Sequence, residues 1–177
     1  MDAFVLDVSA CIPWCCEDET TPASEQMLEW AMDGSAVPSL WTWEILNTVA
    51  VVIKRQRITA GSAREFLEQL ATLNIKIAQP PPIADFPRLH SLAGTHQLTA
   101  YDVAYLDLAK RLSLPLATRD DDLKRAARAE GVQILCSARH IGNRTYRRHG
   151  LHFFAWKGRE VGCHGRKVLL WTNAYAS

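Results

Sequence analysis

Short apolar runs alternate with longer amphipathic segments along the first 135 residues. The run at residues 3–8, AFVLDV, is too short for a helix, and its β-branched residues favour a strand buried on both faces. Similar short runs predict further strands at residues 37–40, 75–78, 114–117 and 132–135. Segments with apolar residues at helical spacing lie between them, at residues 24–33, 43–55, 83–93, 101–112 and 121–130, with one more capped by Thr59. The alternation predicts an α/β fold in which helices flank a parallel sheet of five strands.

Four acidic residues fall where this fold would place a site. Asp7 ends the first predicted strand, and Asp120 follows the fourth. Glu44 and Asp102 lie in the first turns of predicted helices. Sites in open α/β sheets form outside the carboxyl ends of the strands, so we expect these four carboxylates to converge on one cleft.

Each acid also has an ordinary structural explanation. A turn or cap role explains Asp7, and the helix dipole favours Glu44 and Asp102 in first turns. Asp120 is equally well placed to cap the helix that begins at Asp121. The joint placement of all four is what favours a site.

Clustered carboxylates repel one another unless a cation neutralises them, and hard oxygen ligands suit Mg²⁺ or Mn²⁺. Such ions activate a bound water and stabilise charge on a phosphoryl group. The chain contains no GxxxxGK[ST], HExxH, GxSxG or GxGxxG motif, so the usual nucleotide, zinc-protease, hydrolase and dinucleotide signatures are missing. The carboxylates therefore predict metal-dependent phosphodiester hydrolysis.

Composition is that of an ordinary globular protein, with 48% hydrophobic and 22% charged residues. No apolar run reaches the ~18 residues of a membrane helix, and the N-terminus does not resemble a secretory signal. The five cysteines are an odd, scattered set, which favours a reducing cytoplasm over a disulfide framework. We therefore expect a cytoplasmic protein without membrane association.

Charge divides the chain into two units. Residues 1–135 carry 12 Lys and Arg against 18 Asp and Glu, whereas residues 136–177 carry 8 against a single acid, Glu160. We expect a compact domain over residues 1–135 and a basic, mostly irregular tail over residues 136–177, with one short strand at 167–171. The tail mixes arginines with aromatic residues, as single-strand-binding surfaces do, but a read-through or frame-shifted end has the same appearance. Its cysteines and histidines lack zinc-ligand spacing.

Four motifs resemble those of the PIN-domain ribonucleases, and most closely the VapC-type toxins of toxin–antitoxin pairs. They are FVLDVSA at 4–10, WEILN at 43–47, LTAYDVAYL at 98–106 and LATRD at 116–120. Each is short, but their order and spacing are specific. The resemblance covers residues 3–135.

This resemblance implies Mg²⁺ or Mn²⁺ held by Asp7, Glu44, Asp102 and Asp120, which would be both metal ligands and catalytic residues. It implies that Ser9, Asn47 and Thr118 orient the carboxylates. It further implies hydrolysis of RNA by metal-activated water to a 3′-hydroxyl and a 5′-phosphate, a cognate antitoxin and a homodimer. Asp121 or Asp122 would be able to assist or replace Asp120. Asp107, five residues beyond Asp102, is expected to be solvated.

Candidate RNA contacts are Arg119, beside Asp120, and the basic group Lys54, Arg55 and Arg57. A solvated helix end explains the basic group equally well. Tryptophans are suited to stacking on bases but more often fill a core or a dimer interface; the candidates are Trp14, Trp30, Trp41 and Trp43.

Two other functions fit parts of the pattern. A haloacid-dehalogenase-like phosphatase also ends its first strand in Asp, but it needs a second Asp where this chain has Ser9. A non-catalytic RNA- or partner-binding domain would not need all four acids.

Overall fold

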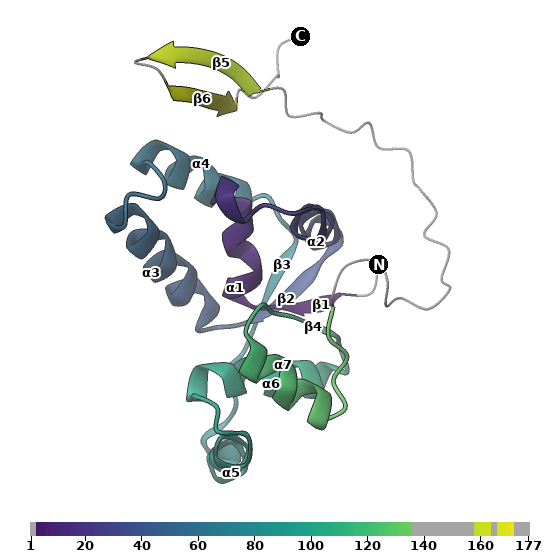
Figure 1. The fold of residues 1–177 in the computed structure, drawn as a ribbon. Helices are drawn as coiled ribbons and strands as arrows, with labels where there is room; N and C mark the ends of the chain where they lie inside the picture. Colours follow the sequence, from purple (N-terminus) through teal and green to yellow (C-terminus); the bar gives the residue numbers. More distant parts are fainter. Residues whose placement is uncertain (1–2, 136–157, 164–165, 172–177) are drawn as a thin grey trace, which may run out of the picture. The chain divides into compact units, whose positions relative to one another are not determined.

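Parallel strands run through the centre of the first unit (Figure 1). The structure is a computed structural model that describes residues 3–135 and, within the rest, the strands at 158–163 and 166–171. In chain order the strands of the parallel sheet are β1 (Phe4–Leu6), β2 (Ser35–Pro38), β3 (Ile75–Ala78) and β4 (Leu116–Ala117). Their spatial order is β3-β2-β1-β4. All residues of β1, β2 and β4 are buried, as expected of a parallel sheet covered on both faces.

The fifth strand predicted at residues 132–135 does not form as a continuous strand. Ile134 makes a single parallel bridge to Leu116. Around it, the backbone N–H of Leu116 donates to Gln133 at 2.8 Å, and that of Leu135 donates to Leu116 at 2.9 Å. β4 pairs with β1 through both of its residues, but on its other side the described pairing stops at this single bridge. The parallel sheet therefore has four strands in the described part of the chain.

Helices cover both faces of this sheet and give three layers. They are α1 (Val8–Cys11), α2 (Pro22–Asp33), α3 (Trp41–Lys54), α4 (Ala60–Leu70), α5 (Phe86–His96), α6 (Ala100–Leu112) and α7 (Asp121–Ala129). Figure 1 shows α1 to α4 on one side of the sheet and α5 to α7 on the other. The predicted α/β fold with a parallel sheet between helices is confirmed.

Helix starts follow the predicted caps more closely than helix ends do. The hydroxyls of Thr21, Thr59 and Thr99 each accept a hydrogen bond from the backbone N–H three residues on. The helix predicted to stop at Gly94 instead continues to His96, because Gln97 takes the left-handed conformation (φ 56°) and ends it. The cap at Thr99 matters for the site, since it fixes the first turn of α6.

Asp107 is not solvated, contrary to the sequence expectation. Its carboxylate is 3% exposed and lies 2.8 Å from the Arg88 guanidinium on α5 and 2.8 Å from that of Arg111 on α6. The residue lies on the face of α6 that packs against α5, so the helix partner decides its environment. Asp107 thus belongs to a buried ion pair that joins two helices.

Asp107→Asn is expected to lower the free energy of unfolding by about 2 kcal/mol, because an amide cannot accept from both guanidinium groups in a buried site. Urea denaturation measures this loss. Asp85→Asn is the matched control: Asp85 lies 3.4 Å from the same Arg88, but on an exposed pair. Its expected cost is under about 0.5 kcal/mol, and equal losses in the two variants would contradict the structural role of Asp107.

The second unit, Asn143–Ser177, contains an antiparallel pair of strands, β5 (Gly158–Cys163) and β6 (Arg166–Trp171). The sequence predicts only the second of these. Gly158 and Gly162 weaken the strand signal of β5, and pairing with β6 along its whole length overrides that weakness. The strand predicted at 167–171 is therefore present as β6, and β5 is an additional strand where the sequence predicted none. Whether the compact domain ends at residue 135 stays a prediction, since residues 136–157 lie outside the described part.

Within the described residues, no helix has the length and apolar character needed to cross a membrane.

Candidate active site

Asp7 lies where β1 ends, and its backbone is tied to the end of β4. Its N–H donates to the carbonyl of Ala117 at 3.0 Å. The side chain is only 8% exposed. The carboxyl edge of the two central strands therefore carries a buried carboxylate, as the sequence predicts.

Two hydroxyls hold this carboxylate from neighbouring segments. Ser9 Oγ donates to Asp7 Oδ2 at 2.5 Å, and Thr118 Oγ1 donates to the same oxygen at 2.6 Å. The hydroxyls are themselves fixed, because Ser9 accepts from the backbone N–H of Arg119 and Thr118 accepts from that of Asp120. The loop after β4 thus orients Asp7 through Ser9 and Thr118, the geometry expected of positioning groups.

Glu44 lies in the first turn of α3 and is partly buried. The phenol of Tyr105 donates a short hydrogen bond to its Oε2. Tyr105 is 2% exposed and buried in the core, so its hydrogen bond joins the second turn of α6 to the first turn of α3. Sequence reasoning missed this residue. Its signal is the spacing Asp102 to Tyr105, which puts both side chains on one face of α6.

Asp102 is engaged in the cap of its own helix. Its Oδ2 accepts from the backbone N–H of Thr99 at 3.1 Å and from the Thr99 hydroxyl at 2.7 Å. The capping box predicts this conformation without any ligand. Asp102 is partly exposed in the first turn of α6. Its negative charge acts on both Asp7 and Glu44.

Negative charge on neighbouring acids contributes to the raised pKa values of Asp7 and Glu44. Burial raises the pKa of Asp7 above its ordinary 3.8, and the negative charge of Asp102 raises it further, while hydrogen bonds from Ser9 and Thr118 oppose the rise. Burial also raises the pKa of Glu44 above 4.5, with smaller contributions in the same direction from Asp7 and Asp102. Carboxylates from three distant parts of the sequence therefore share one electrostatic neighbourhood.

Asp120 is the fourth candidate, and its side chain caps α7. Its Oδ1 accepts from the backbone N–H of Leu123 at 2.7 Å. The neighbouring acids are paired within the same helix, Asp121 with Lys124 and Asp122 with Arg125. Lys124 lowers the pKa of Asp121. Asp7 and Glu44 therefore lie within electrostatic range of each other and of Asp102, whereas Asp120 has a capping contact.

The family assignment follows from comparison with known proteins. The PIN domain family model matches residues 4–129. The chain belongs to the PIN domain family. Domains of this family are generally nucleases that use divalent metal ions, and the predicted family resemblance is confirmed.

Solved structures share the fold of this PIN domain at low sequence identity. PAE2754 from Pyrobaculum aerophilum superimposes with a TM-score of 0.55 and 21% identity, over 70% of this chain and 78% of that chain. FitAcB from Neisseria gonorrhoeae gives a TM-score of 0.49 and 20% identity, over 75% of this chain and 96% of that chain. No curated protein sequence matches the chain.

Asn47, one helical turn beyond Glu44, is exposed in this PIN domain. A surface depression of about 370 Å³ is lined by Ser9, Glu44 and Asn47, together with apolar residues of α1 and the hydroxyl of Thr48. The depression therefore opens onto one of the three coupled carboxylates and onto two of the predicted positioning residues.

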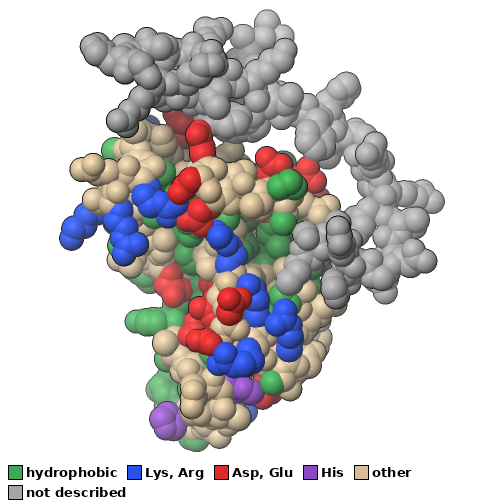
Figure 2. Space-filling model, viewed as in Figure 1, with side chains coloured by type: hydrophobic (Ala, Val, Ile, Leu, Met, Phe, Trp, Pro, Cys, Tyr) green, Lys and Arg blue, Asp and Glu red, His purple; other side chains and the backbone are tan. Residues whose placement is uncertain are grey.

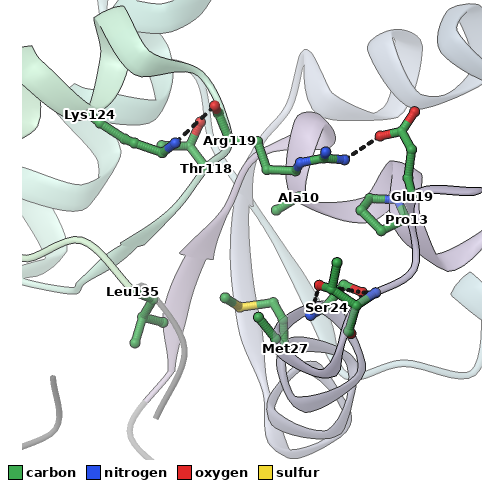
Figure 3. Close-up of a pocket in the computed structure, with 11 residues that line it drawn as sticks. Ala10, Pro13, Glu19, Ser24, Met27, Thr118, Arg119, Lys124 and Leu135 are labelled. Carbon is green, nitrogen blue, oxygen red and sulfur yellow. Dashed lines mark hydrogen bonds and ion pairs between the residues drawn. The ribbon is translucent and has the colours of Figure 1, made fainter. Parts of the chain in front are cut away.

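Arg119 does not point freely to solvent. Its guanidinium pairs with Glu19, across a second pocket of about 290 Å³ that Figure 3 shows. Arg57 also pairs with Glu19, at 2.7 Å, and with Asp18, at 2.9 Å. Burial alone would raise the pKa of Glu19, but the hydrogen bonds and charges of these two arginines outweigh it and lower the pKa. Of the predicted RNA contacts, Arg57 and Arg119 are thus engaged in ion pairs, whereas Lys54 and Arg55 are exposed.

The donor set of this PIN domain fits a divalent cation in its chemistry. Asp7, Glu44 and Asp102 supply only hard carboxylate oxygens, and their mutual repulsion is what a cation would relieve. Among residues 3–135, no three His, Cys, Asp or Glu side chains stand close enough together to hold an ion.

Proposed function

We propose that this PIN domain is a metal-dependent endoribonuclease of the toxin type. The observation that carries the proposal is the buried carboxylate of Asp7 at the end of β1, which Ser9 and Thr118 hold in place within electrostatic range of Glu44 and Asp102. Mg²⁺ or Mn²⁺ is the proposed cofactor, with Asp7, Glu44, Asp102 and Asp120 as its proposed ligands. Choice of RNA as substrate rests on the motif resemblance.

Each side chain has a distinct part in the proposed mechanism. A bound divalent ion supplies an activated water and neutralises charge on the scissile phosphate. Asp7, kept in one orientation by Ser9 and Thr118, provides a fixed anionic anchor beside the phosphate. Tyr105 limits the rotation of Glu44 and keeps one of its oxygens engaged. Asp102, in the first turn of α6, and Asp120, at the N-cap of α7, are the remaining proposed ligands.

The contacts of Ser9 argue against the phosphatase alternative. That chemistry needs an acid two residues after the nucleophilic Asp, and here the Ser9 hydroxyl donates to Asp7 instead. A toxin of this type would be inhibited by a cognate antitoxin and would act as a homodimer in the cytoplasm, and we propose both partners on the resemblance alone.

The test is cleavage of a fluorescent single-stranded RNA by the purified full-length chain. We expect cleavage with millimolar Mg²⁺ or Mn²⁺, none with chelator, and recovery when the metal is restored. Asp102→Asn should reduce the rate by a factor of at least about 100, because it removes a negative charge from the site while its amide oxygen still accepts from Thr99.

Glu25→Gln is the matched control, since Glu25 is an exposed acid in the first turn of α2. Its cleavage rate should equal that of the wild type. Equal cleavage by the wild type and Asp102→Asn would remove Asp102 from the site. RNA binding without any metal-dependent cleavage would favour a non-catalytic domain.

A further inference from the structure

One of the four tryptophans in residues 3–135 is far more exposed to solvent than the other three. Trp30 and Trp41 are 7% and 6% exposed, and Trp14 donates its indole N–H to the carbonyl of Ser24 at 2.9 Å. Trp43 is 75% exposed. It immediately precedes Glu44, so a large ring stands in solvent next to a candidate active-site carboxylate.

Trp43 begins a face of α3 that is exposed in the described part of the chain. The exposed residues recur at helical spacing along this face, which we call the α3 stripe: Trp43, Leu46, Asn47, Ala50 and Lys54. From Trp43 to Lys54 the helix rises about 16 Å. The stripe therefore leads from the carboxylates to the basic end of α3.

We propose that the α3 stripe binds single-stranded RNA on its way to the carboxylates, with one base stacked on Trp43 and the backbone contacted by Lys54 and Arg55. This proposal rests on the proposed nuclease function and names the surface that positions its substrate. Base stacking on aromatic rings and phosphate contacts from cations are the two elements of a single-strand-binding surface.

Two cations at the C-terminal end of the stripe, Lys54 and Arg55, favour RNA over a protein partner as its ligand. Lys54 and Arg55 are exposed, and neither forms an ion pair with a described residue. A scissile phosphate that reaches the carboxylates puts its neighbouring base within reach of Trp43, while phosphates farther along reach the cations. A purely apolar partner surface would leave both cations without a counterpart.

A second exposed ring borders the same acids. Tyr101 is 61% exposed and precedes Asp102, as Trp43 precedes Glu44. The hydrogen bond from Tyr105 to Glu44 joins the second turn of α6 to the first turn of α3, so the N-terminal halves of the two helices that carry these rings are in contact. Figure 2 shows acidic side chains gathered at the middle of the viewed face, with hydrophobic side chains projecting beside them. Two exposed rings, Trp43 and Tyr101, therefore directly precede two of the candidate acids in the sequence.

The test is binding of a fluorescent single-stranded RNA in chelator, measured by anisotropy so that no cleavage is needed. Trp43→Ala should weaken binding at least about fivefold, the loss expected for one stacked base, and Trp43→Phe should recover most of it. Met32→Ala is the matched control, because Met32 is 65% exposed on α2 and away from the stripe. Its affinity should equal that of the wild type.

Salt dependence tests the other end of the stripe. Replacing Lys54 and Arg55 by Gln should make the slope of log affinity against log salt shallower by about 1 to 2. An unchanged slope and unchanged affinity of Trp43→Ala would overturn the proposal. So would absence of RNA binding by the wild type.

Two further measurements distinguish this proposal from its alternatives. Light scattering of Trp43→Ala and the wild type, each without RNA, detects a protein interface: a change in mass with no loss of RNA affinity would assign the stripe to a second copy and overturn the proposal. Wild-type protein that binds RNA through Trp43 but does not cleave it with metal would refute the nuclease function and leave the stripe in place.

Discussion

Asp7→Asn is expected to abolish cleavage and, in the absence of metal, to leave the protein as stable as the wild type or more stable by up to about 2 kcal/mol. The carboxylate of Asp7 is buried and faces the charge of Asp102, so its ionised form costs free energy when no cation is bound. An Asn oxygen still accepts from Ser9 and Thr118. The variant therefore removes the charge while keeping the hydrogen bonds.

Melting temperatures with and without metal measure this directly. With Mn²⁺ at about 100 times its dissociation constant, the wild type should gain about 2.7 kcal/mol, or roughly 5–10 °C. Asp7→Asn should lose most of that gain. Glu25→Gln, the exposed control, should keep it. A wild type that melts at the same temperature in chelator and in millimolar Mn²⁺ would show that the carboxylates do not form a metal site.

Local signals made the layers of the fold predictable. Short apolar runs predict strands and threonine caps mark helix starts, so β1, β3 and the first turn of α6 were predicted nearly where they lie. The fifth strand failed because the run at residues 132–135 pairs with β4 only at Ile134, and an apolar run does not reveal how far pairing extends. Strand length in a sheet depends on the partner as much as on the segment.

The candidate site was predictable to the extent that topology alone places residues. Parallel strands bring their carboxyl ends to one edge, and this rule placed Asp7 near Glu44 and Asp102. Contacts set by packing of distant segments were not predictable. Glu19 pairs with Arg119, 100 residues away, and Tyr105 reaches Glu44 across 61. Asp107 was misjudged for the same reason, since only the docking of α5 buries it.

The pH dependence of stability should change sign with metal, and this follows from the raised pKa values of Asp7 and Glu44. In the metal-free protein both groups hold protons more tightly when folded than at their ordinary 3.8 and 4.5. Their contribution to stability is therefore fully present below about pH 4 and is lost as pH rises through the folded pKa values. Glu19 and Glu130 have lowered pKa values and act in the opposite direction, in the wild type and in Asp7→Asn alike.

The difference between the two proteins isolates the effect of Asp7. In chelator, the stability of Asp7→Asn relative to the wild type should increase as pH rises from about 4 to 7, as urea denaturation at each pH would measure. In saturating Mn²⁺ the wild type should instead gain on the variant over the same range, because ligation requires deprotonated carboxylates. Parallel curves in both conditions would mean that Asp7 ionises normally and binds no metal. Opposite slopes would tie the burial of Asp7 to its proposed role, since the charge that weakens the empty fold is the charge that would bind the ion.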